Sequence, residues 1–286
     1  MAFPQCMGGE GPIIETASQI VQDPFFEAIE ITRVKDAALR RQLRSILQES
    51  RMEAYFGAQP ITLGGGLDLN HPDAASRRQA VTAVKEGIDQ AAELGCKAVA
   101  VLSGKVTADK EAAMQRLVDS LLQLCDYAHQ QDLKLVLETF DQVPYGKNCL
   151  IGPTSDAVRV SEQVRRKYPD FGLMLDLSHL PLIGESAADA IGAAGDHLAH
   201  VHIGNCAMDD PKHPAYGDNH PRFGAPGTRN DVPELTEFLR VLLNTGYLST
   251  KERNVVSFEV KPMTGESAEA VIAGSKRTLL EAWRNA

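Results

Sequence analysis

The sequence lacks the features that would place it in a membrane, in the secretory pathway or on nucleic acid. No run of about 18 or more apolar residues occurs, so we expect no membrane-spanning helix. The N-terminus, MAFPQCMGGEG, has neither a basic start nor an apolar segment, which argues against a secretory signal. The formal net charge is −9 and no strong basic patch is visible, which disfavours nucleic acid as a partner. These absences favour a cytoplasmic protein with no membrane partner.

Cysteine is scarce, and nucleotide-binding glycine motifs are missing. The five cysteines are an odd number with no CxxC pair, so we expect reduced thiols that serve packing. No GxGxxG follows the first expected strand, and no GxxxxGK[ST] occurs. We interpret the run Gly64–Gly66 as only a glycine-rich loop. Nucleotide-binding open sheets are therefore disfavoured, and a non-phosphorylated substrate is favoured.

The sequence does contain short β-rich runs that alternate with longer helical patterns, which is typical of a parallel sheet built from βαβ units. A length of 286 residues suits one α/β barrel, which needs roughly 250 residues. We therefore predict a single (β/α)8 TIM-barrel domain over residues 1–286. The eight expected strands are Phe3–Met7, Phe26–Ile31, Glu53–Ile61, Ala98–Leu102, Lys134–Glu138, Gly172–Leu177, Leu198–Ile203 and Val255–Val260.

The expected helices carry apolar residues at helical spacing. Gly95 is expected to end the second long helix, because glycine is the usual residue at that position. The predicted ranges are Ile13–Gln22, Lys35–Ser50, Ser76–Leu94, Glu111–Gln131, Ser155–Tyr168, Ser186–Ala194, Pro233–Leu243 and Ala268–Trp283.

Polar side chains end four consecutive strands. Glu138 follows three aliphatic residues, Asp176 ends GLMLD, His202 lies in LAHVHIGN, and Glu259 lies in VVSFEVKP. Side chains alternate across a strand, and one consistent inward assignment directs all four into the barrel mouth. In parallel barrels the active site lies at this end of the strands. The pattern therefore predicts that the four groups converge.

Three carboxylates and an imidazole at one point require an explanation. Each residue alone is commonly a helix cap, a salt-bridge partner or a core histidine. Three carboxylates in a low-dielectric cavity would repel one another, and a divalent cation removes that repulsion. An oxygen-rich set with one imidazole suits Mn²⁺, Mg²⁺ or Co²⁺, with Zn²⁺ also possible. We predict one divalent metal ion, with Mn²⁺ as the first choice.

Further candidates lie near these strand ends. His179 follows Asp176 closely and is a candidate for contact with substrate or metal. His200 lies one pleat deeper than His202, so an outer supporting or core role is expected. Lys261 is a candidate for a substrate oxygen, although an exposed strand-end lysine would look the same.

One long loop, Asn205–Asp231, follows the seventh expected strand and has no secondary-structure period. Loops of this length in compact domains are usually functional or disordered. His213, His220 and Arg222 are its candidates for substrate binding, lid closure or subunit contact. The sequence does not separate these roles.

The segments LVLETF, LMLDLSHL, AHVHIGN and SFEVKP resemble those of the xylose-isomerase-like TIM barrels, the sugar isomerase/epimerase superfamily. They look most like the ketose 3-epimerase branch, with inosose dehydratases and the large subunits of C-glycoside-cleaving enzymes as relatives. The resemblance implies metal ligation by Glu138, Asp176, His202 and Glu259. The spacing from Asp176 matches that branch for His202 better than for His200.

The resemblance also implies a mechanism. A proton next to a carbonyl would be removed to form an enediolate, with Glu138 and Glu259 as the catalytic acid and base. His179, His220, Arg222 or Lys261 would bind substrate hydroxyls. The substrate would be a small sugar or polyol, and the enzyme would serve carbohydrate metabolism as a homo-oligomer.

Three other functions stay open. Metal-dependent lyase or dehydratase chemistry on keto-sugars, inososes or keto-glycosides would also pass through an enolate, and an accessory subunit would then complete the site. An apurinic-site endonuclease would need more metal ligands and a basic groove. A metal-free barrel would act only as a binding protein.

Overall fold

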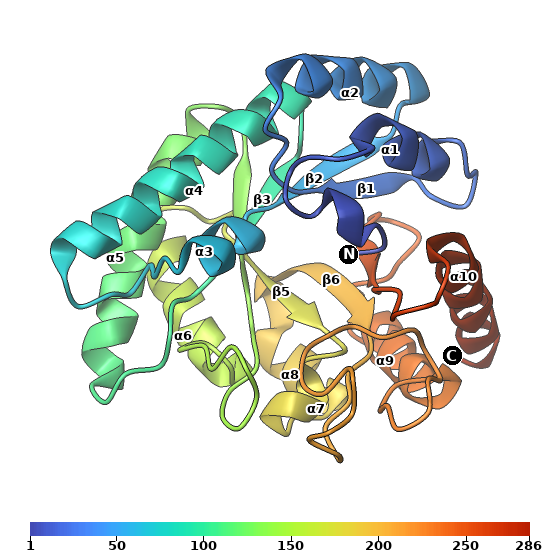
Figure 1. The fold of residues 1–286 in the computed structure, drawn as a ribbon. Helices are drawn as coiled ribbons and strands as arrows, with labels where there is room; N and C mark the ends of the chain where they lie inside the picture. The colour runs from blue at the N-terminus through green and yellow to red at the C-terminus, as the bar shows by residue number, and fades with distance from the viewer. The chain divides into compact units, whose positions relative to one another are not determined.

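The computed structural model describes all residues, 1–286, and the chain divides into two compact units. The N-terminal unit comprises residues 5–137 and 160–172, and the C-terminal unit comprises residues 1–4, 138–159 and 173–286. No helix combines the length and apolar character needed to cross a membrane. Figure 1 shows the order of the elements along the chain.

The N-terminal unit contains four strands in chain order, with β1–β2 and β2–β3 paired in parallel. They are β1 (Ala28–Ile31), β2 (Glu53–Gly57), β3 (Ala98–Leu102) and β4 (Lys134–Glu138), whose last residue belongs to the C-terminal unit. Every residue of β3 is buried, as expected for a strand covered on both faces. Its helices are α1 (Ile13–Val21), α2 (Ala37–Ser50), α3 (Gln59–Gly65), α4 (Ala74–Leu94) and α5 (Lys110–His129).

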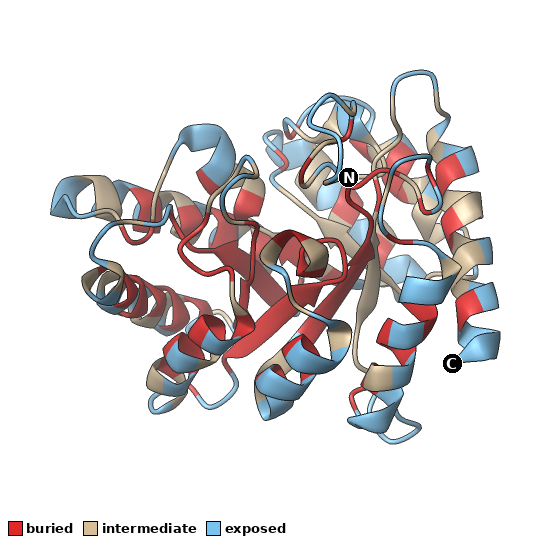
Figure 2. Cartoon of the chain, turned by 90° about the horizontal axis from the view of Figure 1, so that it is seen from below, coloured by how far each residue is buried: buried red, intermediate tan, exposed pale blue.

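Local signals set the ends of these helices. Asp36, Asp73 and Asp109 precede α2, α4 and α5, and each accepts a hydrogen bond from a backbone N–H of the first turn. Gly95 ends α4 at φ +75°, as predicted from the sequence. Figure 2 shows the result: the strands are largely buried, and the helices are buried on one side and exposed on the other.

The C-terminal unit contains three strands: β5 (Gly172–Asp176), β6 (Leu198–Gly204) and β7 (Val256–Glu259). Only the first residue of β5, Gly172, belongs to the other unit. Strand β6 pairs in parallel with both β5 and β7. The register aligns Asp176 with His202, and Gly204 with Glu259. The helices that lie wholly in this unit are α7 (Leu180–Ile183), α8 (Ala187–Ala194), α9 (Val232–Asn244) and α10 (Ala268–Asn285). Helix α6 (Thr154–Arg165) is divided between the two units.

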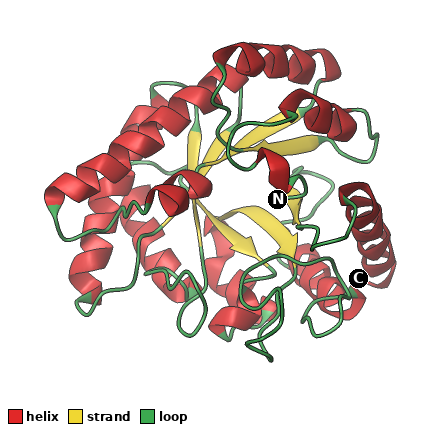
Figure 3. Cartoon of the chain, viewed as in Figure 1, coloured by secondary structure: helices red, strands yellow, loops and turns green.

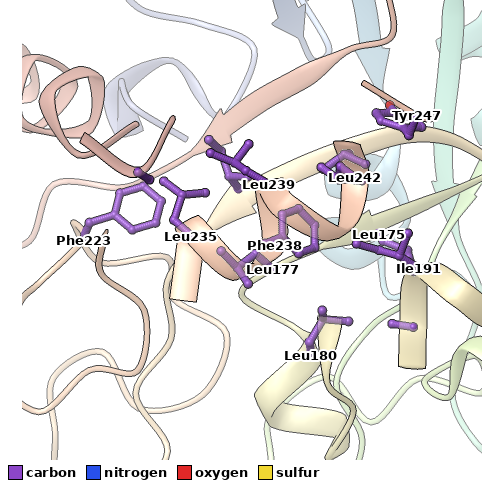
Figure 4. Packing of buried hydrophobic residues seen from close by; sticks show 14 of the residues in the cluster. Leu175, Leu177, Leu180, Ile191, Phe223, Leu235, Phe238, Leu239, Leu242 and Tyr247 are labelled. Atoms are coloured by element: carbon purple, nitrogen blue, oxygen red, sulfur yellow. The ribbon is translucent and has the colours of Figure 1, made fainter. Parts of the chain in front are cut away.

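Apolar side chains from α9 pack on those of β5 and β6 (Figure 4). Phe238 and Leu242 of α9 and Leu175 of β5 are all fully buried. Full burial of a side chain of this size stabilises the fold by about 1.5–3 kcal/mol. The cluster holds β5 and β6 firmly, and the polar residues that end these strands are therefore positioned by a packed core.

Two predictions about the strands were wrong. The range Phe3–Met7 forms no strand but a short 3-10 helix, η1 (Pro4–Cys6), because proline has no N–H to donate to a sheet ladder. Strand β2 ends at Gly57 rather than Ile61, and α3 begins at Gln59, with Pro60 in its first turn. The chain thus has seven strands instead of eight. Each predicted helix is present, with shifted ends. Gly64 and Gly65, interpreted as loop residues, form the last turn of α3 instead.

Candidate metal centre

The structure brings together the four polar residues predicted at the ends of consecutive strands. One ligand atom from each of Glu138, Asp176, His202 and Glu259 lies within 4.8 Å of the others. The side chains of Glu138, Asp176 and His202 are 1%, 0% and 5% exposed, whereas that of Glu259 is 22% exposed. The cluster is therefore largely removed from water, and Glu259 gives it an opening to solvent.

The imidazole of His202 faces all three carboxylates. Its Nδ1 atom lies 2.7 Å from Glu259 Oε2, 3.7 Å from Glu138 Oε1 and 3.8 Å from Asp176 Oδ2. Asp176 Oδ1 accepts the backbone N–H of Ser178 at 2.6 Å, whereas its buried Oδ2 makes no hydrogen bond. An anionic oxygen in this state needs a positive partner.

Burial and neighbouring charges pull the pKa values of the carboxyl groups apart. Burial raises the pKa of Asp176 to about 6, against the opposing effect of His220. Burial also acts to raise the pKa of Glu259, but the nearby His220 and His202 outweigh it and hold that pKa well below its usual range. One carboxyl group of the cluster is therefore hard to ionise without a cation, and another is readily ionised.

The donor set fits a divalent cation. Three carboxylates and one imidazole are the ligands that Mn²⁺, Mg²⁺ and Co²⁺ accept, and Zn²⁺ also binds such mixed sets. A buried cluster of this charge without a cation would be strongly destabilising. The unpartnered Oδ2 of Asp176 marks a point where a cation would be bound.

The loop between β6 and α9, residues 205–231, brings Asp218 and His220 beside this cluster. Figure 3 shows it as a long irregular segment, as predicted for this range. Asp218 Oδ1 lies 2.6 Å from His220 Nε2 and 3.1 Å from Nε2 of His179, the residue before α7. The Nδ1 atom of His179 lies 2.7 Å from the carbonyl oxygen of Thr139. All three side chains are at most 2% exposed.

A second loop supports Asp218. Lys147 forms an ion pair with Asp218 Oδ2, and its Nζ atom lies 5.0 Å from the centre of the Phe140 ring. The Phe140 ring in turn contacts the ring of His179, with centroids 4.6 Å apart. These contacts order the loop after β4 and orient the Asp218 carboxylate toward the two histidines.

The loop of residues 205–231 is fixed at its base by two asparagines. Asn205 Oδ1 accepts the backbone N–H of Asn230 at 2.7 Å. The Asn230 side-chain amide donates to the carbonyl oxygens of Gly204, at 3.0 Å, and Leu177, at 3.2 Å. The two ends of the loop are thereby joined next to β6.

Two predicted loop residues lie elsewhere. The guanidinium of Arg222 pairs with Glu266 at 2.9 Å and lines a cavity of about 250 Å³ at the start of α10. The half-buried ring of His213 has its Nε2 atom 3.0 Å from the carbonyl oxygen of Pro226. The structure brings neither side chain into contact with the four strand-end residues.

The remaining strand-end candidates are placed as follows. His200 is buried, with its Nε2 atom 3.4 Å from Ser257 Oγ. The backbone N–H of Lys261 donates to the carbonyl oxygen of His220 at 2.7 Å, while its side chain forms no ion pair.

Sequence reasoning missed Asp218 and Lys147, because both lie in loops. The one available signal for Asp218 was its position two residues before His220.

Comparisons with known proteins agree with this architecture. Residues 22–281 match the family model described as xylose isomerase-like TIM barrel. This match confirms both the resemblance and the α/β TIM-barrel fold predicted from the sequence, although with seven strands.

Curated relatives match over shorter stretches. The D-psicose 3-epimerase of Ruminiclostridium cellulolyticum is 29% identical over 105 residues, which is 37% of this chain and 34% of that protein. The fructoselysine 3-epimerase of Shigella flexneri is 25% identical over 165 residues, which is 57% of this chain and 58% of that protein. The chain thus spans about a third and somewhat over half of the length of these two relatives.

A solved structure extends the similarity of fold over almost the whole chain. The IOLI protein with a bound zinc atom aligns with a TM-score of 0.72 at 19% identity, covering 94% of this chain and 92% of that one. At this identity the likeness concerns the fold.

Proposed function

Because the chain belongs to the xylose isomerase-like TIM barrel family, we propose that it is a metal-dependent epimerase or isomerase of a small, non-phosphorylated sugar or polyol. The observation that carries this proposal is the convergence of three carboxylates and one imidazole within 4.8 Å. The names of the two curated relatives, both sugar 3-epimerases, support it. We propose Glu138, Asp176, His202 and Glu259 as the metal ligands and Mn²⁺ as the ion.

The chain's own residues would move the proton. When bound, the cation would act as a Lewis acid on a substrate carbonyl and a neighbouring hydroxyl. Glu259 is held ionised by its histidine neighbours and is partly open to solvent, which suits a base that accepts the proton next to the carbonyl. Glu138, on a different strand, would return a proton to the same carbon. A positioned acid or base typically contributes 10²–10⁴-fold to the rate.

Other residues of the site would position the substrate. We propose that His179 and His220, which border the cluster with His220 Nε2 3.7 Å from Glu259 Oε1, contact substrate hydroxyls. The side chain of Lys261 has no ion-pair partner and is free to contact a substrate oxygen. Arg222 is paired with Glu266 and would have to leave this ion pair to contact a substrate.

A substrate screen tests the proposal. Protein loaded with Mn²⁺ would be incubated with free ketoses, and the products separated by chromatography. We expect one ketose to be converted into its epimer or aldose isomer, and conversion to stop after chelation. Inososes and 3-keto-glycosides form a second arm, and a dehydrated or cleaved product there would replace the epimerase assignment by a lyase. No conversion in either arm by the metal-loaded protein would overturn the proposal.

A further inference from the structure

The two histidines that border the strand-end cluster are closed off from solvent. The side chain of His179 is 0% exposed, and those of Asp218 and His220 are each 2% exposed. Among the four strand-end residues, Glu259 is the most exposed, at 22%. A sugar bound at the proposed site would have to touch ring atoms of His179 and His220, which this conformation does not present. The structure is therefore a closed form of the site.

A short segment of the loop between β4 and α6, residues 141–149, lies against these buried groups. It is folded on itself: the backbone N–H of Cys149 donates to the carbonyl oxygen of Asp141 at 2.9 Å, and Asp141 Oδ2 accepts the N–H of Lys147 at 2.9 Å. Its tip lies in solvent, with Val143 70% exposed. A loop that bonds to itself in this way keeps its shape when it moves as one piece.

Two contacts join residues 141–149 to the loop of residues 205–231. Lys147 forms an ion pair with Asp218 Oδ2, and its Nζ atom donates to the Asp218 carbonyl oxygen at 3.4 Å. The rings of Tyr145 and Tyr216 have centroids 5.6 Å apart, and both side chains are half-buried. On each segment the tyrosine precedes the charged residue by two positions, so the two contacts belong to one continuous interface. Together they hold the segment in its closed position.

The ionic contact is suited to repeated opening. The side chain of Lys147 is 25% exposed, so its ammonium group can separate from Asp218 directly into water. The carboxylate of Asp218 becomes hydrated when the segment swings out, so neither charge is left both buried and unpaired. The aromatic contact favours closure, because separation of the two rings exposes apolar surface to water. The two contacts therefore favour the closed form while they leave opening accessible.

We propose that residues 141–149 form a lid, whose Lys147–Asp218 and Tyr145–Tyr216 contacts open to admit a ligand to the two histidines and close behind it. Closure removes water from the site, which strengthens the electrostatic interactions of the bound ligand. Lid movement of this kind sets the turnover rate of many enzymes. The role of the lid in turnover rests on the proposed function, whereas the movement itself does not.

Chemical labelling tests the lid without any substrate. Diethyl pyrocarbonate modifies histidine ring nitrogens, and mass spectrometry of peptides gives the rate at each residue. Lys147→Met removes the ionic contact, and we expect His179 and His220 to be modified at least about tenfold faster than in the wild type. Lys147→Arg keeps the charge and should label at a rate near that of the wild type. Lys212→Met, which removes an exposed lysine of the 205–231 loop, is the matched control and should not change the rates.

A disulfide across the lid tests the opposite direction. A Cβ atom added at Gly217 would lie 3.9 Å from Cβ of Tyr145, which is within the range that a disulfide needs. In the double variant Tyr145→Cys with Gly217→Cys, oxidation should slow both the labelling of His179 and the conversion of a sugar by at least about tenfold, and a reductant should restore both. Gly217 has φ +79°, so each single variant, treated with the same oxidant, controls for strain.

A measurement on the wild type covers the case in which the variants do not fold. Opening of a lid exposes little surface, so the labelling rate of His179 should hardly change with urea below the unfolding transition. A steep rise with urea would mean that the ring is reached only by global unfolding, and it would overturn the lid. Equal labelling of His179 in the wild type, Lys147→Met and the oxidised double variant would do the same.

The sugar measurement separates the lid from the proposed function. Unchanged conversion after oxidation of the double variant would overturn the role of the lid in turnover. A protein that shows the expected labelling but converts no sugar would keep the lid and lose the proposed function.

Discussion

His220 packs against Gly204 so closely that no side chain fits between them. A Cβ atom added at Gly204 would lie 3.0 Å from Nδ1 of His220 and 2.8 Å from the carbonyl oxygen of Glu259. It would also lie 3.3 Å from Oδ1 of Asp176. The absence of a side chain at Gly204 is therefore what allows the loop after β6 to approach the strand-end cluster.

The substitution Gly204→Ala should damage the site through this contact. The methyl group must displace backbone at Glu259 or the ring of His220, and we expect a destabilisation of about 1–3 kcal/mol with weakened metal binding. Thermal unfolding and metal titration measure the two effects. Gly192→Ala is the control: nothing lies within 4 Å of the added atom in helix α8, so stability should be unchanged or slightly raised. Equal behaviour of the two variants would contradict the packing argument.

The amides Glu138→Gln and Glu259→Gln should abolish turnover while the protein stays folded. Each removes a negative charge and the capacity to accept a proton, and we expect kcat to fall by at least about 10²-fold. Glu237→Gln, on the exposed face of α9, removes a carboxylate of the same size and should leave kcat unchanged. Steady-state kinetics with the converted sugar provide the measurement. Full activity in either site variant would remove that residue from the mechanism.

Metal affinity should depend on pH through Asp176. Burial raises the pKa of this carboxyl to about 6, so its proton and the cation compete for the same oxygens in the mildly acidic range. The sign is definite: affinity is highest above pH 6, where the carboxyl is ionised, and falls below it. Where one proton is displaced, the fall is about tenfold per pH unit.

Calorimetric titration of Mn²⁺ between pH 5 and 8 tests this dependence. Circular dichroism at each pH shows that the protein stays folded over the range used. An affinity that is constant from pH 5 to 8 would contradict the assignment of Asp176 as a ligand.

The buried thiols should be unreactive in the native protein. Burial raises the pKa of Cys96, Cys125 and Cys206 to about 12, so the thiolate that reacts with disulfide reagents is almost absent near pH 8. Cys149 is also buried, whereas Cys6 is partly exposed. We expect one rapidly reacting thiol in the folded protein and five after denaturation. Removal of Cys6 by Cys6→Ser should abolish the rapid phase, and several fast thiols in that variant would contradict the burial.

The strand-end residues could be predicted because two regular patterns coincide there. Alternation along a strand gives a side chain its face, and the parallel arrangement brings the carboxyl ends of neighbouring strands together. Asp176 and His202 are accordingly aligned in the β5–β6 register. The range Phe3–Met7 was misread because its apolar composition suits a strand, while Pro4 removes the donor that a strand requires.

The loop residues of the site could not be predicted in the same way. Asp218 and Lys147 are distant in sequence and belong to segments without periodicity, so no spacing rule relates them. Their ion pair depends on two loop conformations that only the folded structure defines. Arg222, in contrast, had the right chemistry for a substrate contact, but the structure pairs it with Glu266 at the start of α10.

The two asparagines at the base of the 205–231 loop fix its ends independently of the residues between them. Asn205 and Asn230 close its ends on each other and on the last residue of β6, so the intervening residues do not determine where β6 stops or where α9 starts. Changes of length or composition between Asn205 and Asn230 would alter which loop side chains lie next to the strand-end cluster. The strands and helices on either side would be retained. If the chain acts on a sugar as proposed, we expect that exchange of the segment between Asn205 and Asn230 among homologues would change substrate preference while the barrel is retained.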